Sequence, residues 1–303
     1  MISLITPNYN GSSWLNECLD SVANQSADQH DIEMIIVDDG STDDSRDIIE
    51  SYSADIPGLK PIWHEHTGKP GALRNLAINR ALGSYVLFLD SDDYLGSEAV
   101  ERLSVFTAEG DTDVVAFQLA GLDRNVPSSM LQETIHDADL VSSGLYKTLG
   151  IWKMCKKDFL DRHSIRFDPS VGRGDDVTFM AETMLRAKKL SVLGGGYPFY
   201  TVRGREDGSS ITQKEWNHDK RIDVAVTVGR LTKQLAPTES IANHFYIRLF
   251  NADVLDIIAS PSVNEQIIRR LKAELGPYWS SDVAELIYSD ESRERLVNFF
   301  NES

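Results

Sequence analysis

The sequence of 303 residues has only two cysteines, Cys18 and Cys155, and neither stands at a spacing typical of metal ligands. Two thiols cannot build a disulfide framework, so we expect both to be buried and reduced. The sequence also lacks any apolar run near the roughly 18 residues that a membrane-spanning helix needs. Residues 1–6 have neither the basic flank nor the small-residue cleavage site of a signal peptide. These absences predict a soluble, cytoplasmic protein without a transmembrane segment.

Positive charge is also in short supply. There are 30 Lys and Arg residues against 47 Asp and Glu, which gives a formal net charge of −17. Nucleic acids and anionic membranes attract basic surfaces, so we expect no nucleic-acid partner and at most a weak contact with a membrane surface. With 41% hydrophobic and 25% charged residues, the composition is that of a globular protein, which excludes disorder as a description of the whole chain.

Strand and helix signals alternate along the first third of the sequence. Short apolar or β-branched runs occupy 2–6, 32–37, 62–66 and 85–89, and apolar residues at helical spacing lie between them. Pro70 stands where the third of these helices would begin. The alternation predicts an α/β fold with a mostly parallel sheet flanked by helices.

Three of the predicted strands end in polar clusters, at residues 6–10, 38–41 and 90–93. The carboxyl ends of parallel strands share one edge of a sheet, so we expect the three clusters to lie together and to bind a ligand there. The two carboxylates of Asp90 and Asp92 suit a divalent cation with oxygen ligands. Such an ion would also let an acidic rim bind a pyrophosphate. The alternative for any single cluster is an ordinary strand-to-helix turn.

The pattern changes toward the C-terminus. A strand is predicted at 114–119, a polar loop at 121–145 and a helix at 175–185. Beyond residue 216 glycines become few and long amphipathic patterns take over. We therefore predict an α/β domain over 1–216 and a helical C-terminal region over 217–303, which could bind an acceptor or mediate homo-oligomerisation.

Several segments, in matching order and spacing, resemble the motifs of family-2 glycosyltransferases with the GT-A fold. They are residues 7–10, 37–43, 74–75, 88–93, 174–179 and 200–211. The similarity covers about residues 1–215. It implies an inverting, metal-dependent enzyme that moves a hexose or N-acetylhexosamine from a UDP-sugar to a hydroxyl of a glycan, a wall polymer or a lipid-linked acceptor.

The resemblance also implies roles for individual residues. The positions assigned to the UDP-sugar are Pro7, Tyr9, Asp38, Asp39, Lys69, Arg74, Asp90, Ser91, Arg203, Arg205 and Ser209. Asp92, together with Asp90, is assigned to Mn²⁺ or Mg²⁺. Asp176 is assigned as the base that deprotonates the acceptor. Asp175 holds the first position of the same motif, where the family usually has the longer Glu.

Two other functions remain open at the level of the sequence. A nucleotidyltransferase that makes a nucleotide-sugar would want a glycine- and lysine-rich phosphate loop after the first strand, where this chain has residues 7–10. A non-catalytic sugar-nucleotide-binding or scaffold protein would not need Asp92 and Asp176.

His218 follows the segment that resembles the family, at a position where related enzymes sometimes supply a third metal ligand.

Overall fold

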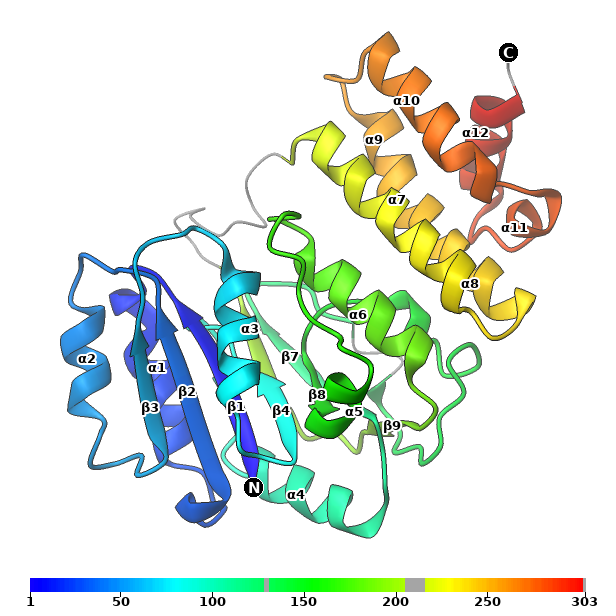
Figure 1. The fold of residues 1–303 in the computed structure, drawn as a ribbon. Helices are drawn as coiled ribbons and strands as arrows, with labels where there is room; N and C mark the ends of the chain where they lie inside the picture. The colour runs from blue at the N-terminus through cyan, green and yellow to red at the C-terminus, as the bar shows by residue number, and fades with distance from the viewer. Residues whose placement is uncertain (128–130, 205–215, 302–303) are drawn as a thin grey trace.

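A computed structural model describes residues 1–127, 131–204 and 216–301. Its central sheet has the strand order β3–β2–β1–β4–β8–β6–β9 (Figure 1). The strands are β1 (Ile2–Asn8), β2 (Ile32–Asp38), β3 (Leu59–Trp63), β4 (Tyr85–Phe88), β6 (Val114–Phe117), β8 (Lys153–Lys156) and β9 (Leu190–Leu193). β1 pairs in parallel with β2 and β4, and β2 with β3, whereas β8 runs antiparallel between β4 and β6. The predicted α/β fold with a mostly parallel sheet is confirmed.

Burial explains why the first strands form where the sequence predicts them. Every residue of β2 is buried, as expected for a mostly apolar strand covered by helices on both faces. In Figure 1, α3 (Pro70–Arg80) and α6 (Asp175–Arg186) lie in front of the sheet and α1 (Ser12–Ala23) lies behind it. The apolar face predicted for α1 is buried, and Cys18 and Cys155 are both buried and unpaired.

The remaining elements of the α/β part complete this arrangement. They are the helices α2 (Ser45–Ser51), α4 (Ala99–Glu109) and α5 (Lys157–Arg162), and a small second sheet of β5 (Tyr94–Leu95), β10 (Tyr200–Arg203) and β7 (Leu119–Leu122). The small sheet was not predicted, because β5 has only two residues and its pairing partners lie far along the chain. β10 returns the chain to the turn that follows β4.

The prediction of a strand over 62–66 was wrong at both ends. β3 begins at Leu59 and ends at Trp63. The next residues form a loop because the carboxylate of Asp39 accepts hydrogen bonds from the backbone N–H groups of Thr67 and Gly68, at 2.9 and 2.8 Å. These bonds draw the chain over the end of β2 instead of along it.

The C-terminal part is helical, as predicted, and packs on α6 (Figure 1). It contains α7 (His218–Leu235), α8 (Glu239–Leu249), a π-helical turn (Phe250–Val254), α9 (Leu255–Ala259), α10 (Glu265–Leu275), α11 (Ser281–Glu285) and α12 (Asp290–Asn301). Most of its buried apolar residues form a core of their own, but Val228 and Phe245 belong to the core of the α/β part. Across the ranges that the structure describes, no helix is both long and apolar enough to cross a bilayer.

The division at residue 216 stays a prediction, and a truncation tests it. A chain of residues 1–216 should keep the sheet folded, because most residues in the core of the α/β part lie in the sheet and its flanking helices. It should melt at a lower temperature and bind more of the dye ANS than the full chain, because the surface of α6 that α7 covers becomes exposed. An unchanged melting temperature would show that the helical region contributes nothing to the stability of the sheet.

Candidate functional site

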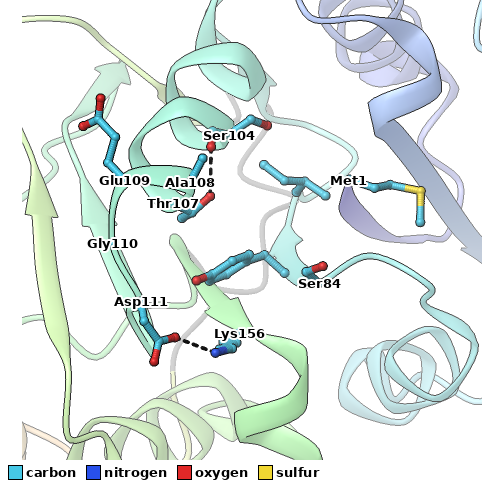
Figure 2. Close-up of a pocket in the computed structure, with 11 residues that line it drawn as sticks. Met1, Ser84, Ser104, Thr107, Ala108, Glu109, Gly110, Asp111 and Lys156 are labelled. Atoms are coloured by element: carbon cyan, nitrogen blue, oxygen red, sulfur yellow. Dashed lines mark hydrogen bonds and ion pairs between the residues drawn. The ribbon is translucent and has the colours of Figure 1, made fainter.

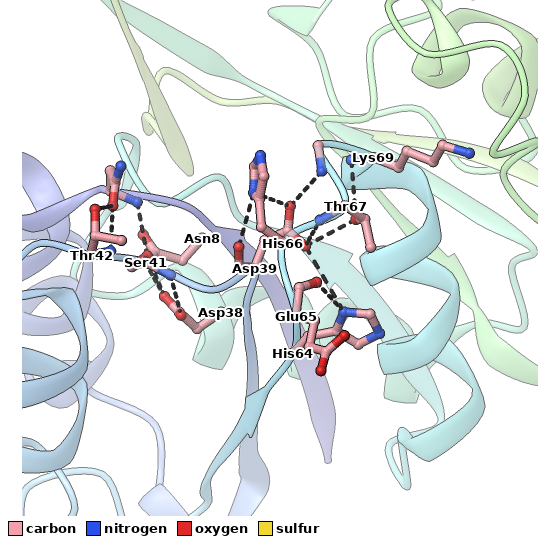
Figure 3. A network of polar contacts seen from close by, with 12 residues as sticks. Asn8, Asp38, Asp39, Ser41, Thr42, His64, Glu65, His66, Thr67 and Lys69 are labelled. Atoms are coloured by element: carbon pink, nitrogen blue, oxygen red, sulfur yellow. Dashed lines mark hydrogen bonds and ion pairs between the residues drawn. The ribbon is translucent and has the colours of Figure 1, made fainter.

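The loops that follow β1 and β2 are joined by a network of hydrogen bonds around Asp38 (Figure 3). One carboxylate oxygen of Asp38 accepts from the side-chain amide of Asn8 at 2.8 Å and from the hydroxyl of Ser41 at 2.6 Å. The other accepts from the backbone N–H of Ser41 at 2.9 Å. Asp38 is 4% exposed. Asp38 was predicted to bind the UDP-sugar. In the structure its carboxylate is hydrogen-bonded to Asn8 and Ser41 and so connects the ends of β1 and β2.

Asp39 joins the same rim to the loop after β3 (Figure 3). Its Oδ1 accepts from the backbone N–H and the hydroxyl of Thr67, both at 2.9 Å. Its Oδ2 lies 3.1 Å from Nδ1 of His66, and Asp39 is 2% exposed. A buried carboxylate needs hydrogen-bond donors such as these to offset its lost hydration. Asp39 therefore fixes the position of His66 over the end of β2.

An aromatic face lies at the outer side of this rim. The ring of Tyr9 stacks on His66 with centroids 4.1 Å apart and an interplanar angle of 25°. Tyr9 is 48% exposed, so part of its surface is accessible to a planar ligand. Pro7 lies near the end of β1, and Lys69 lies just before α3 with its side chain extending away from the network in Figure 3.

His66 is a residue that the sequence analysis did not assign to the site. The signal that could have found it is the polar segment 64–69, which follows a strand as the three recognised clusters do. The misplaced end of β3 concealed this segment, because it put His66 inside the predicted strand.

Arg74 lies between the acidic groups that follow β4 and those at the start of α6. Its Nη2 donates to Oδ1 of Asp90 at 2.7 Å, and the residue is 6% exposed. Burial lowers the pKa of Arg74, but the charges of Asp90, Asp175 and Asp176 outweigh burial and raise it. The guanidinium therefore stays protonated; it is hydrogen-bonded to the turn after β4 and lies within the electrostatic influence of the α6 aspartates.

The turn after β4 is anchored to β10 through Asp93. The carboxylate of Asp93 accepts from the hydroxyl of Tyr200 at 2.7 Å and from the backbone N–H of Arg203 at 2.8 Å. Burial raises the pKa of Asp93 well above its usual range, and the nearby charges of Asp90 and Asp92 raise it further. The aspartates of this turn are therefore close enough to repel one another.

Arg203 and Ser91 flank the same turn. Nε of Arg203 donates to the backbone carbonyl of Asp92 at 2.9 Å, and its guanidinium also pairs with Glu17 of α1. Ser91 is 7% exposed. The structure thus places both residues beside the acidic cluster, whereas the predicted Arg205 and Ser209 lie outside the described residues.

The carboxylates of this turn fit a divalent ion whose other ligands come from water and phosphate and not from protein side chains. Carboxylate oxygens are the ligands that Mg²⁺ and Mn²⁺ prefer, and a cation near Asp90 and Asp92 would relieve the repulsion that raises the pKa of Asp93. Among the described residues, no group of three or more His, Cys, Asp or Glu side chains is arranged to hold a metal. His218 instead contacts Ser260 and Ser262 through Nε2, at 3.2 and 2.9 Å.

Asp175 and Asp176 form the first turn of α6, where the helix dipole favours negative charge. Asp175 is 6% exposed, and its Oδ1 accepts from the backbone N–H of Asp176 at 2.8 Å. Gly71 of α3 leaves room for the carboxylate of Asp175, because a Cβ at that position would collide with its Oδ2. Burial raises the pKa of Asp175 to about 6 and also raises the pKa of the half-buried Asp176, although Arg74 opposes both shifts.

Lys153 begins β8 at the same edge of the sheet and is 2% exposed. Its Nζ donates to the backbone carbonyl of Gly150 at 3.0 Å and to the hydroxyl of Thr148 at 3.4 Å, which are neutral acceptors. Burial lowers the pKa of Lys153 to about 8, although the charge of Asp176 acts in the opposite direction. A buried ammonium group whose close acceptors are neutral destabilises a fold, and such groups gather at functional sites.

A cleft of about 600 Å³ lies at the opposite edge of the sheet (Figure 2). It is bordered by the amino end of β1, by Tyr85 at the start of β4 and by the end of α4, and the ion pair of Lys156 with Asp111, at 2.5 Å, lies on its wall. None of the predicted site residues that the structure describes lines this cleft. The polar clusters therefore converge away from this cleft.

Comparison with known proteins places the chain among glycosyltransferases. The family model described as "Glycosyl transferase family 2" matches residues 3–164. A poly(ribitol-phosphate) beta-glucosyltransferase of Bacillus spizizenii is 41% identical over 207 residues, which are 68% of this chain and 32% of that protein. The poly(ribitol-phosphate) beta-N-acetylglucosaminyltransferase TarS of Staphylococcus aureus is 28% identical over 294 residues, which are 96% of this chain and 50% of that protein.

The solved structures agree with the sequence comparison. The crystal structure of S. aureus TarS 1–349 in complex with UDP-GlcNAc matches with a TM-score of 0.87 at 27% identity, over 99% of this chain and 89% of that one. The fold implied by the resemblance is thus confirmed. This chain spans about a third to a half of the length of the curated relatives named above.

The substitution Lys153→Met tests whether the buried ammonium group destabilises the fold. The unfolded chain binds a proton at Lys153 up to its ordinary pKa of about 10.4, whereas the folded chain loses it near 8. At pH 7 the variant should therefore unfold with a free energy higher by up to about 3 kcal/mol. The gain should shrink between pH 8 and 10, because the wild type gains stability there. Urea unfolding at three pH values measures it, and a loss of stability at pH 7 would contradict the argument.

Proposed function

This chain belongs to glycosyl transferase family 2, and we propose that it transfers a sugar from a UDP-sugar to a hydroxyl of a poly(ribitol-phosphate) acceptor with inversion at the anomeric carbon. The sugar is a hexose or an N-acetylhexosamine. The observation that carries the proposal is the position of Arg74, whose guanidinium donates to Asp90 in the turn after β4 and is influenced by the charges of the two aspartates that begin α6. Donor and base are then on facing sides of one rim.

The donor is bound at the ends of the strands. Tyr9, stacked on His66, offers an aromatic face to the uracil, and Asp39 holds the loop that carries His66. Asp92 and Asp90 would hold a divalent ion, which supplies a Lewis acid for the diphosphate when it is bound. Arg203 lies beside the same turn, where a cation suits the negatively charged diphosphate.

Asp176 acts as the base. It accepts the proton of the acceptor hydroxyl while the oxygen attacks the anomeric carbon and the bond from that carbon to UDP breaks. Burial raises its pKa, which makes it a stronger base than an exposed aspartate. Asp175 accepts from the backbone N–H of Asp176 and thereby positions it. A single base and no protein nucleophile lead to attack opposite the leaving group, hence to inversion. Assembly through the C-terminal helices stays a prediction.

The substitution Asp92→Asn tests the metal site. It removes a charge from the turn after β4, so the affinity for UDP measured by calorimetry with Mn²⁺ should fall about tenfold or more, while the weak affinity without metal should stay the same. Asp290→Asn is the matched control, because Asp290 is exposed on α12 and should leave both affinities unchanged. Equal affinity of Asp92→Asn and the wild type in Mn²⁺ would refute the role of Asp92.

The substitution Asp176→Asn tests the base. An amide cannot take the proton, so transfer should fall by about a hundredfold to ten-thousandfold. UDP should bind with nearly its wild-type affinity, because Asp176 does not take part in donor binding in this proposal. Release of UDP in the presence of poly(ribitol phosphate) measures the first quantity and calorimetry the second. Transfer at the wild-type rate would exclude Asp176 as the base.

A further inference from the structure

The π-helical turn Phe250–Val254 joins α8 to α9 and contains Asp253, which is 5% exposed. Turns of this kind are rare and occur frequently at functional sites. Oδ1 of Asp253 accepts from Nε of Arg221 at 3.4 Å, and Oδ2 accepts from Nη1 of Arg248 at 3.1 Å. The backbone carbonyl of Ala252 also accepts from Arg221. The turn therefore joins α7, which carries Arg221, to α8, which carries Arg248.

Arg221 connects this turn to the start of α6, along which α7 lies in Figure 1. Its guanidinium carbon is 5.3 Å from the centroid of the Trp216 ring, within the range of a cation–π contact. Gly174, which directly precedes α6, has a φ of +90°, in the left-handed region that favours glycine. A Cβ at Gly174 would lie 2.9 Å from Cζ2 of Trp216 and 2.9 Å from Cγ2 of Val224. The turn into α6 is therefore packed directly against Trp216 and α7.

Arg248 connects the π-helical turn to the proposed base through its charge. Burial raises the pKa of Asp176, and the charges of Arg74 and Arg248 lower it. Asp253 pairs with both arginines of the helical region, whereas the exposed Asp256 pairs with Arg221. Removal of one partner from a buried ion pair is costly, so the arginine side chains should shift when the charge of Asp253 is lost.

We propose that Asp253 is a positioning residue for the proposed base: it fixes the turn into α6 through Arg221 and holds the charge of Arg248 near Asp176. This inference rests on the proposed function. The base must lie within hydrogen-bond reach of the acceptor hydroxyl, so a displacement of about 1 Å at the start of α6 slows transfer strongly. The helical region then contributes to catalysis through packing, and Asp253 itself needs no contact with donor or acceptor.

The experiment compares Asp253→Asn with Asp290→Asn, using poly(ribitol phosphate) and whichever of UDP-glucose and UDP-GlcNAc the wild type consumes. Asn keeps the size of the side chain but turns an NH₂ group toward one of the two arginines, where both groups are donors. Asp290 is the matched control, because it pairs with Arg293 of the helical region at 2.9 Å but is 96% exposed. In Asp253→Asn the kcat per UDP-binding site should fall about tenfold to a hundredfold, while the KM for the donor stays nearly the same. Asp290→Asn should match the wild type.

The number of UDP-binding sites separates positioning from folding. Calorimetry counts these sites, which belong to the α/β part of the chain. A rate that falls only in proportion to the number of sites would show a loss of folded protein and would overturn the inference. A kcat equal to that of the wild type would overturn it as well and leave the proposed function intact.

Hydrogen exchange followed by mass spectrometry tests the same inference without any transfer. The backbone N–H of Thr178 donates to the carbonyl of Gly174 at 3.2 Å, so its exchange reports on the first turn of α6. It should exchange faster in Asp253→Asn than in the wild type and in Asp290→Asn, and equal exchange would contradict the role of Asp253. If the wild type binds UDP but does not modify poly(ribitol phosphate), the proposed acceptor is wrong, and hydrogen exchange still decides whether Asp253 fixes the start of α6.

Discussion

The buried guanidinium of Arg74 is the interaction on which the candidate site depends. Asp90 follows β4, whereas Asp175 and Asp176 begin α6, and these elements are far apart in the sequence. Brought together in a partly buried place, three carboxylates would repel one another and take up protons. Arg74 donates to Asp90 and opposes the rise in pKa of both α6 aspartates. One cation on α3 thereby lets the acidic ends of two elements share a rim.

The rest of the rim is held together by a different means. Asp38 and Asp39 are almost fully buried, and they accept hydrogen bonds from backbone N–H groups and hydroxyls of neighbouring loops. These donors lie on segments that follow β2 and β3, so the two carboxylates fix the loops to one another. The stacked pair of Tyr9 and His66 is positioned as a result. Two buried carboxylates thus fix the shape of the proposed nucleotide-binding edge.

One cation is held where the fold does not favour it. Lys153 is buried with neutral acceptors, and burial lowers its pKa to about 8. Burial of a charge without a matching partner lowers stability, and such groups gather at functional sites. The charge of Asp176 acts on Lys153 in the opposite direction. Near the proposed base, therefore, the fold retains a group that lowers its stability.

Much of the fold and of the candidate site could be predicted from the sequence, because these features depend on the spacing of residues within short segments. The apolar run of β2, the buried face of α1 and the polar clusters at strand ends lie within short windows, and parallel pairing puts such ends at one edge. Arg74 and Asp176 were identified because the motifs that contain them resemble those of family-2 glycosyltransferases. The short β5, by contrast, has no periodic signal, because two residues are too few to show one.

Only the tertiary structure decided which distant residues meet. His66 reaches Tyr9 because the loop after β3 is drawn onto Asp39, and Trp216 joins Arg173 to Arg221 because α7 packs on the start of α6. The antiparallel β8 brings Lys153 to the edge where the parallel strands end. Contacts of this kind depend on the packing of whole elements, whose relative positions are set by the shared core and not by any short stretch of the chain.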